Sequence, residues 1–450
     1  MKLFLSVCLL SIVIQYSSPV HADELDVAAI RHDIESVLDE DYPQLEKLYE
    51  DIHAHPEVGF QETRTAALLA AQMRKLGFAV TEKVGGTGIV AIFHNGPGPT
   101  ILVRTELDGL PMEEKTGLPY ASKYKQIVDG KSSYIAHSCG HDVHMAWWVG
   151  TAKALLAMKN RWSGTLMFIG QPAEETVSGA KAMIADGLFT RFPKPDYGFA
   201  AHVGPGPVGT VVIKDGIVSS ASDALEITFK GRGGHGSMPS ATIDPITIAA
   251  HFVSDVQTII SREKDANAFG VITVGSFHAG SAGNIIPDEA DLKLSLRSFT
   301  PEVRELLLKG VERTANASAS MAGAPPPEIH HLSGTSAVRN DSALAARANL
   351  LLKQALGNGV TFVPSSAPGG APSEDFSQFI DAGVPSVFFA IGGYDAKTIA
   401  DYKARGVPLP VNHSPYFAPA PKPAIETGVK VLTMAVLMVT AKNAAANSHR

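Results

Sequence analysis

The stretch HSCGHDVHMA, from His137 to Ala146, brings three histidines, an aspartate and a cysteine into ten residues. Thiolate, imidazole and carboxylate groups together are ligands that zinc takes in proteins, and manganese or cobalt can replace it in a tolerant site. Cys139 is one of only two cysteines in the chain, and the other, Cys8, lies near the N-terminus. A bound metal would hold the Cys139 thiol as a thiolate. The stretch therefore predicts one part of a metal site.

Other polar residues of these types stand where apolar, β-rich runs end. They follow the runs that begin at residues 100, 165 and 197, or lie in the loop VNHSP after the last such run: Asp108, Glu174, Glu175, His202 and His413. Open α/β sheets bind ligands outside the carboxyl ends of their strands. We therefore expect these side chains to meet at one rim of a sheet, which the loop carrying Cys139 and His141 can also reach.

The adjacent pair Glu174 and Glu175 points to a division of labour. Two carboxylates at a buried strand end cannot both be ionised and unpaired without a large free-energy cost. If one binds a metal and the other faces the attacking water, the pair becomes a ligand and a general base. Taken singly, a histidine at a strand end is more often structural, and Glu-Glu more often opens a solvated helix. The convergence of all these residues on one rim favours the metal site.

The elements that must position these residues alternate between strand and helix. Apolar spacing predicts helices over residues 25–52, 62–76, 144–158, 178–186, 342–355 and 429–439, and strands over 100–106, 165–170, 197–203 and 385–393. Such alternation predicts an α/β fold with a mostly parallel, doubly wound sheet covered by helices on both faces.

The pattern changes between residues 222 and 332. A strand at 223–231, a helix at 244–261, strands at 270–277 and 290–299, a helix at 301–321 and a possible strand near Glu328 form a β-α-β-β-α-β unit. We interpret it as a second, ferredoxin-like domain inserted into the first. The predicted boundaries are 1–22 for a signal peptide, 23–220 and 333–450 for the catalytic domain, and 221–332 for the insertion.

The composition and the N-terminus bound the partners and the location. The net charge of −7 without a Lys/Arg cluster argues against nucleic acid as a partner, and no apolar run after the N-terminus is long enough to predict a membrane anchor. Residues 1–22 combine Lys2, an apolar stretch from Leu3 to Ile14 and a small-residue cleavage pattern that ends at Ala22. This pattern predicts an exported protein, periplasmic or secreted.

Seven motifs together carry a family resemblance over nearly the whole chain. They are HAHPEVGFQE (His53 to Glu62), HSCGHDVHMA, GQPAEETVSGAKAMIADG, GGHGSMP, GNIIPDEA, PSEDFSQF and VNHSP. The chain resembles the amidohydrolase branch of the aminoacylase/carboxypeptidase metallopeptidases. That branch includes hippurate hydrolases, indoleacetyl-amino-acid hydrolases and related N-acyl-amino-acid amidohydrolases.

The resemblance implies a site for two divalent metal ions. By motif, the ligands would be Cys139, His141, Glu175, His202 and His413. Glu174 matches the general base, and Asp108 an aspartate close to the metals. Asp142 and His144 would support the ligands or the helix start, and His137 receives no role. The family's usual run is R-A-D-M-D-A-L-P, whereas this chain has RTELDGLP, so Glu106 stands where aspartate is common.

The resemblance also makes the insertion a lid and dimerisation domain, so that a homodimer or higher oligomer is expected. His235 and Asn284 match positions that polarise the scissile carbonyl, and in relatives the histidine can come from the partner subunit. Arg297 is a candidate for the substrate carboxylate because a guanidinium suits a planar anion; a surface ion pair on the lid is the alternative. Ser373 to Asp375 would shape the pocket floor or cap a helix.

The implied reaction is hydrolysis of an N-acyl or N-aroyl amino acid, such as hippurate or an ochratoxin-like aromatic amide. A metal-bound water would attack the amide carbon, with Glu174 as the base. Three alternatives stay open: a carboxypeptidase or dipeptidase on the same scaffold, a thiol enzyme with Cys139 as nucleophile, and an exported binding protein with a structural metal. Activity on free dipeptides would favour the first, and activity that survives chelation would favour the second.

Overall fold

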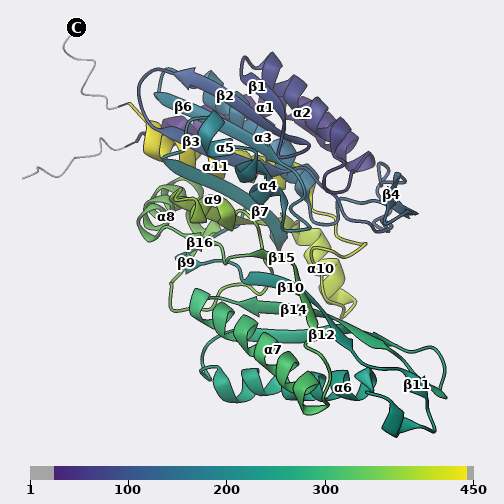
Figure 1. The fold of residues 1–450 in the computed structure, drawn as a ribbon. Helices are drawn as coiled ribbons and strands as arrows, with labels where there is room; N and C mark the ends of the chain where they lie inside the picture. The colour runs from purple at the N-terminus through teal and green to yellow at the C-terminus, as the bar shows by residue number, and fades with distance from the viewer. Residues whose placement is uncertain (1–24, 443–450) are drawn as a thin grey trace, which may run out of the picture.

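The computed structural model describes residues 25–442, and the predicted signal peptide at 1–22 lies outside them. Figure 1 shows a large sheet layered with helices and, at the opposite end of the molecule, a smaller sheet with helices against it. The chain passes from the large sheet into the small one and back again.

The large sheet is mixed and mostly parallel. Its order is β1 (Ala79–Val84), β2 (Gly88–Asn95), β6 (Gly164–Gln171), β3 (Thr100–Glu106), β7 (Tyr197–Pro207), β18 (Ser386–Tyr394), β8 (Val211–Lys214) and β17 (Val360–Val363). The four central strands β6, β3, β7 and β18 are parallel to one another. Antiparallel neighbours flank them, because β2 joins β6 and β8 joins β18 in that sense. The predicted α/β class is therefore confirmed, with antiparallel strands at its margins.

Alternate residues of the central strands feed two separate cores. In β3, Ile101 and Val103 point to one core while Leu102 points to the other. The first core lies under α1 (Val27–Ala54), α2 (Thr63–Lys75), α3 (His141–Ala157), α8 (Ser342–Leu356) and α11 (Pro421–Thr440). The second lies under α4 (Gly179–Ala185), α5 (Leu188–Arg191) and α9 (Ser377–Asp381). Helices thus cover both faces of the sheet.

Helices α3 and α11 form the central helix pair. Trp147 of α3 packs so closely on Gly428 of α11 that a Cβ atom at Gly428 would lie 2.3 Å from the indole ring. Among the described residues, α11 is long and apolar enough to cross a membrane by length and composition, but 72% of that window is buried inside the protein. The helix predicted over 429–439 is part of it, and its apolar residues belong to the core of the large domain.

The small sheet is antiparallel, in the order β12 (Gly270–Ala279), β14 (Glu289–Ser298), β10 (Ala221–Lys230) and β15 (Glu328–Thr335). Helices α6 (Pro245–Asp255) and α7 (Pro301–Met321) pack on it and share its apolar core. This is the expected β-α-β-β-α-β succession. We call this unit the lid. The domain boundaries proposed from the sequence stay predictions.

Several elements differ from expectation. The helix expected over 244–261 ends at Asp255 and is followed by a π-helical turn, Ile259–Glu263. Helix α3 begins at His141, three residues before the expected start, because Gly140 takes a left-handed φ of 91° at the N-cap. The remaining elements are short: β4 (Lys125–Val128), β5 (Lys131–Tyr134), β9 (Gly216–Ile217), β11 (Gly234–His235), β13 (Ile285–Ile286), β16 (Arg339–Asn340), α10 (Ala396–Ala404) and the 3-10 turns Pro239–Ala241 and Gly357–Gly359.

Candidate metal centre and catalytic site

The turn before α3 places two candidate ligands at the carboxyl ends of the central strands. Gly140 separates Cys139 from His141, and a Cβ atom at Gly140 would lie 2.4 Å from the side chain of Val203 in β7. Only glycine combines this close approach with a positive φ. Cys139 and His141 are therefore held on either side of a tight turn against β7.

The five candidate ligands predicted from the motifs form one connected group. Cys139 Sγ lies 3.4 Å from His202 Nε2. Cys139, Glu175 and His413 offer ligand atoms within 4.8 Å of one another, and His413 Nε2 lies 3.2 Å from Glu175 Oε2. His141 Nε2 lies 4.0 Å from Glu175 Oε1. The structure thus brings together residues that are up to 274 positions apart in the sequence (139 to 413).

Two of these atoms identify what the group could hold. His141 Nε2 and Glu175 Oε1 are buried and have no hydrogen-bond partner. Buried polar atoms without partners are destabilising, and a cation would satisfy both. Burial lowers the pKa of His141, but Asp108 and Glu106 outweigh burial and raise this pKa to about 10. The pocket therefore strongly favours positive charge, and its sulfur, nitrogen and oxygen donors fit divalent cations.

The Nδ1 hydrogen bonds of His141 and His202 leave each Nε2 as the ring nitrogen that faces the site. His141 Nδ1 donates to the backbone oxygen of Asp108 at 2.8 Å, and His202 Nδ1 donates to the backbone oxygen of Val203 at 2.8 Å. A proton fixed on Nδ1 by a carbonyl is the arrangement that orients a metal-binding histidine.

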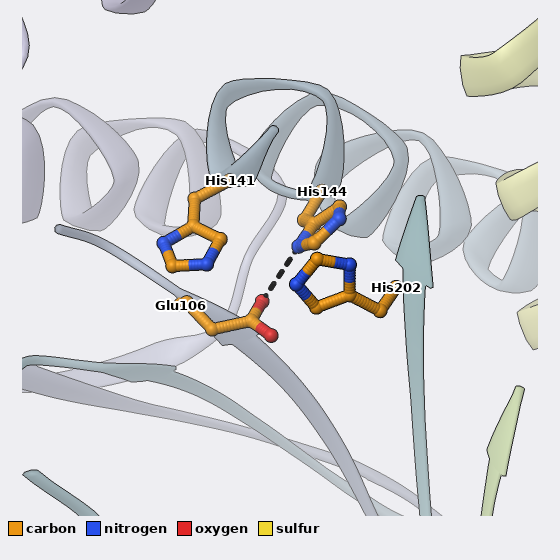
Figure 2. Close-up of side chains that lie close together, drawn as sticks. All are labelled: Glu106, His141, His144 and His202. Atoms are coloured by element: carbon orange, nitrogen blue, oxygen red, sulfur yellow. Dashed lines mark hydrogen bonds and ion pairs between the residues drawn. The ribbon is translucent and has the colours of Figure 1, made fainter. Parts of the chain in front are cut away.

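His144 lies in the same cluster but is already satisfied. Figure 2 shows it beside Glu106, His141 and His202, with its ring facing Glu106. The backbone N–H of Val203 donates to His144 Nε2 at 2.9 Å, so the ring proton is on Nδ1, which donates to Glu106 at 2.9 Å. Both nitrogens are used. His144 therefore supports its neighbours, as expected from the sequence.

Glu106 stands where the family usually has aspartate, and its carboxylate has two buried partners. Its carboxylate lies between His144 and the buried guanidinium of Arg104, with which it forms an ion pair. Arg104 also binds Glu374 at 2.6 Å and Asp375 at 3.2 Å. Glu374 and Asp375 thus join the floor of the site through Arg104, a residue to which sequence reasoning gave no role.

Glu174 is buried beside these carboxylates. One oxygen each from Glu174, Glu374 and Asp375 lies within 4.8 Å of the others. Burial, followed by the charges of Glu374 and Glu175, raises the pKa of Glu174 well above its usual range. A carboxyl group with a raised pKa is suited to accept a proton and later release it.

Asp108 connects the two halves of the candidate site. Its Oδ2 accepts the backbone N–H of Glu175 at 2.9 Å, and its own backbone oxygen accepts from His141. Asp108 therefore holds the backbone of Glu175 and the imidazole of His141.

His53 and Asp142 show why the start of α3 stays in place. His53 lies buried between Asp142 at 2.6 Å and Glu114 at 3.0 Å. Burial lowers the pKa of His53, but these two hydrogen bonds outweigh it and raise the pKa to about 10. Asp142 thus anchors the helix that begins at His141.

Within one chain, His235 and Asn284 of the lid do not reach the candidate metal ligands. His235 is exposed in the β11–β13 hairpin, at the end of the lid far from the large sheet (Figure 1). Its Nδ1 accepts from the backbone of Ser237 at 3.1 Å. The backbone oxygen of Asn284 accepts from the backbone N–H of Gly236, next to His235, at 2.8 Å. Arg297 of β14 does reach the large domain, where it donates to Ser373 Oγ at 2.5 Å.

Comparison with known proteins decides the family. The model of peptidase family M20/M25/M40 matches residues 102–437. The chain belongs to this family.

The M20 relatives include named amide hydrolases. The chain is 41% identical over 265 residues to a hippurate hydrolase of Campylobacter jejuni, covering 58% of this chain and 66% of that enzyme. It is 32% identical over 360 residues to an N-acetylcysteine deacetylase of Bacillus subtilis, covering 78% of this chain and 88% of that enzyme. A dinuclear metal-binding M20 peptidase of B. subtilis superposes with a TM-score of 0.69 at 27% identity, over 89% of this chain and 99% of that structure. The protein is a metal-dependent hydrolase of amides.

These relatives overturn one prediction. Export with cleavage near Ala22 was expected from residues 1–22, which lie outside the described residues. The similar enzymes are named as a hippurate hydrolase and as deacetylases of small acylated amino acids, and none of these names describes an exported protein. The prediction of a periplasmic or secreted enzyme is therefore wrong.

Variants of the two histidines of α3, His141 and His144, should differ in how much metal they bind. When the wild-type enzyme is loaded with excess metal, we expect it to retain about two equivalents of metal per chain. His141→Ala should lose at least one equivalent because its Nε2 faces the group. His144→Gln should keep both, with affinity weakened by roughly 10- to 100-fold. Metal analysis of the dialysed proteins checks this, and the reverse pattern would show that the ligand assignment is wrong.

Proposed function

We propose that this M20 enzyme hydrolyses N-acyl and N-aroyl amino acids to a carboxylic acid and a free amino acid. The observation that carries the proposal is the pair Glu174 and Glu175. Both carboxylates lie near His141, but Glu175 also lies beside Cys139 and His413, whereas Glu174 also faces the carboxyls of Glu374 and Asp375 and has a raised pKa. The names of the relatives point to the same substrate class.

Each residue then has a task in the reaction. Cys139, His141, Glu175, His202 and His413 would hold two divalent cations, either zinc, manganese or cobalt. When bound, these cations supply Lewis acidity that polarises the amide carbonyl and lowers the pKa of water. Glu174 takes a proton from the attacking water and returns it to the leaving amine. Asp108 holds Glu175 and His141 in position during these steps through its hydrogen bonds to both.

Arg297 is the proposed anchor of the substrate carboxylate. Its guanidinium is half-buried, its pKa is lowered by burial, and the polar side chain that it binds is the neutral Ser373. Arg297 forms no ion pair among the described residues, which supports a substrate anchor over a surface ion pair on the lid. A free guanidinium between the lid and the site floor suits a planar anion.

His235 and Asn284 are proposed to act from the partner subunit of a homodimer. Both lie on the hairpin of the lid that points away from the large sheet. The lid also exposes an edge strand, β12, on which Phe277 is 39% exposed, and Ile285 of the hairpin is 53% exposed. Unpaired strand edges with apolar side chains favour pairing with another copy.

The rival mechanisms fit the site less well. A nucleophilic cysteine needs positive surroundings, whereas burial and the neighbouring Glu175 and Glu174 raise the pKa of Cys139 well above its usual range. A dipeptidase on this scaffold would need a group that binds a free substrate amine.

We expect hippurate and N-acetyl amino acids to be cleaved, and free dipeptides to be cleaved at least tenfold less efficiently. Preference for dipeptides would replace the proposed function with the rival one.

Glu174→Gln should separate chemistry from metal binding. The amide keeps the shape of the side chain but cannot accept a proton, so kcat should fall by roughly 10²- to 10⁴-fold. Metal content and thermal unfolding should stay close to those of the wild type. Steady-state kinetics on the best substrate of the panel checks this. Full turnover by the metal-loaded variant would exclude Glu174 as the base.

Arg297→Ala should weaken recognition of the substrate carboxylate. A hydrogen-bonded charge pair contributes about 1.5–3 kcal/mol, so KM for hippurate should rise roughly 10- to 100-fold. The matched control is hippuramide, whose amide replaces the carboxylate and whose KM should hardly change on substitution. Equal effects on both substrates would assign Arg297 a structural role.

Active-site complementation tests the partner's contribution. Glu174→Gln and His235→Ala each inactivate a homodimer, but a mixed dimer has one intact composite site if His235 acts across the interface. Purified mixed dimers should therefore recover about half of the wild-type activity. Mixed dimers as inactive as the two parents would place His235 in its own subunit's site, and a monomer in sedimentation would remove the partner altogether.

A further inference from the structure

The motif HAHPEVGFQE contributes no candidate ligand, yet its last residue reaches the catalytic strand end. Glu62 is fully buried at the N-cap of α2. Its side chain does not cap that helix. Glu62 Oε1 instead accepts the backbone N–H of Ala173 at 2.8 Å, and Oε2 accepts the hydroxyl of Thr87. The carboxylate thus joins three segments that are distant in sequence.

Ala173 has an unusual backbone conformation just before the catalytic pair. Its φ is +49°, in the left-handed region that non-glycine residues rarely adopt. Such a conformation costs about 1 kcal/mol or more and persists only when its surroundings hold it. Since Ala173 directly precedes Glu174 and Glu175, its φ sets the direction in which both side chains leave the strand end.

The same motif closes over this turn. A Cβ atom at Gly59 would lie 2.9 Å from Ala173 Cβ, so the glycine permits direct contact. The backbone N–H of Gly109, next to Asp108, donates to the backbone oxygen of Glu57 at 2.7 Å. The segment from Glu57 to Glu62 therefore lies against both the Asp108 loop and the turn that carries Glu174.

We propose that Glu62 is a positioning residue that holds Ala173 in its left-handed conformation and thereby fixes where Glu174 and Glu175 point. This rests on the proposed function of that pair. Without the acceptor at Ala173 N–H, the turn relaxes toward negative φ and both carboxylates leave their places. Glu62 acts here as a hydrogen-bond acceptor, so its charge is not required.

The environment of Glu62 agrees with a role that does not need charge. It forms no ion pair within the described part of the chain. Burial, with the nearby Asp108, raises the pKa of Glu62 to about 7. A carboxamide in its place can still accept from Ala173 through its oxygen while its NH₂ group donates to Thr87.

Four variants test the proposal in the metal-loaded enzyme: Glu62→Gln, Glu62→Ala, Ala173→Gly and the double variant Glu62→Ala/Ala173→Gly. Glu62→Gln should keep kcat within about threefold of wild type. Glu62→Ala should lower kcat roughly 10- to 100-fold while KM changes less than about threefold, because the base is misplaced and Arg297 is not. Ala173→Gly should restore part of the loss in the double variant, since glycine adopts positive φ without strain.

Glu57→Gln is the matched control. Glu57 is a buried glutamate of the same motif, and its side chain accepts the backbone N–H groups of Arg64 and Thr65 in the first turn of α2. It does not contact Ala173. Its substitution should lower the thermal unfolding midpoint and leave kcat within about twofold. A general loss of stability is thereby separated from misplacement of the base.

A spectroscopic readout keeps the proposal independent of turnover. In cobalt-loaded protein, Glu62→Ala should alter the visible absorption bands because Glu175 moves, whereas Glu62→Gln and Glu57→Gln should reproduce the wild-type spectrum. Glu62→Ala with wild-type kcat and spectrum, or Glu62→Gln as damaged as Glu62→Ala, would overturn the proposal. A wild type that cleaves no N-acyl amino acid would overturn the proposed function instead, and the cobalt spectra would still test Glu62.

Discussion

An excess of buried negative charge is the constraint on which the rest of this structure depends. Six carboxyl groups gather at one rim of the large sheet around a single guanidinium, that of Arg104: Glu106, Asp108, Glu174, Glu175, Glu374 and Asp375. Burying ions without compensation is costly. The raised pKa values of Glu174 and His141 reduce that cost, and divalent cations held by the candidate ligands would offset the rest.

Parallel strands and locally strained turns hold these carboxyl groups in place. Strands β3, β6 and β7 deliver their last residues to the same rim. The residues between strand and site adopt left-handed backbone conformations at Gly140, Ala173 and His413, with φ of 91°, 49° and 68°. Strain of this kind concentrates at functional sites because only the surrounding contacts maintain it. The segment Glu57 to Glu62 and the His53–Asp142 pair supply such contacts.

Much of this arrangement follows from the sequence. Strand ends predicted the rim, since the period of apolar residues reveals parallel strands and the first polar residue after each strand. The short strands β8 and β17 were not predicted, because four residues are too few to show an apolar period. Spacing alone could not assign His144, whose tautomer is set by its hydrogen bond from Val203, or explain Glu106, which pairs with Arg104 two residues before it on β3. His235 matched its motif, yet one chain alone keeps it far from the ligands. The prediction of export from the N-terminal pattern was wrong, because an apolar stretch that resembles a signal peptide does not by itself define the location of the protein.

The most direct test of the central claim is a crystal structure of the metal-loaded protein with anomalous diffraction collected at the metal absorption edge. The account predicts two strong peaks roughly 3.5–4 Å apart, bounded by Cys139, His141, Glu175, His202 and His413, with Glu174 close by but unligated. A single peak held by Glu106 and His144, or no peak at this rim, would contradict it.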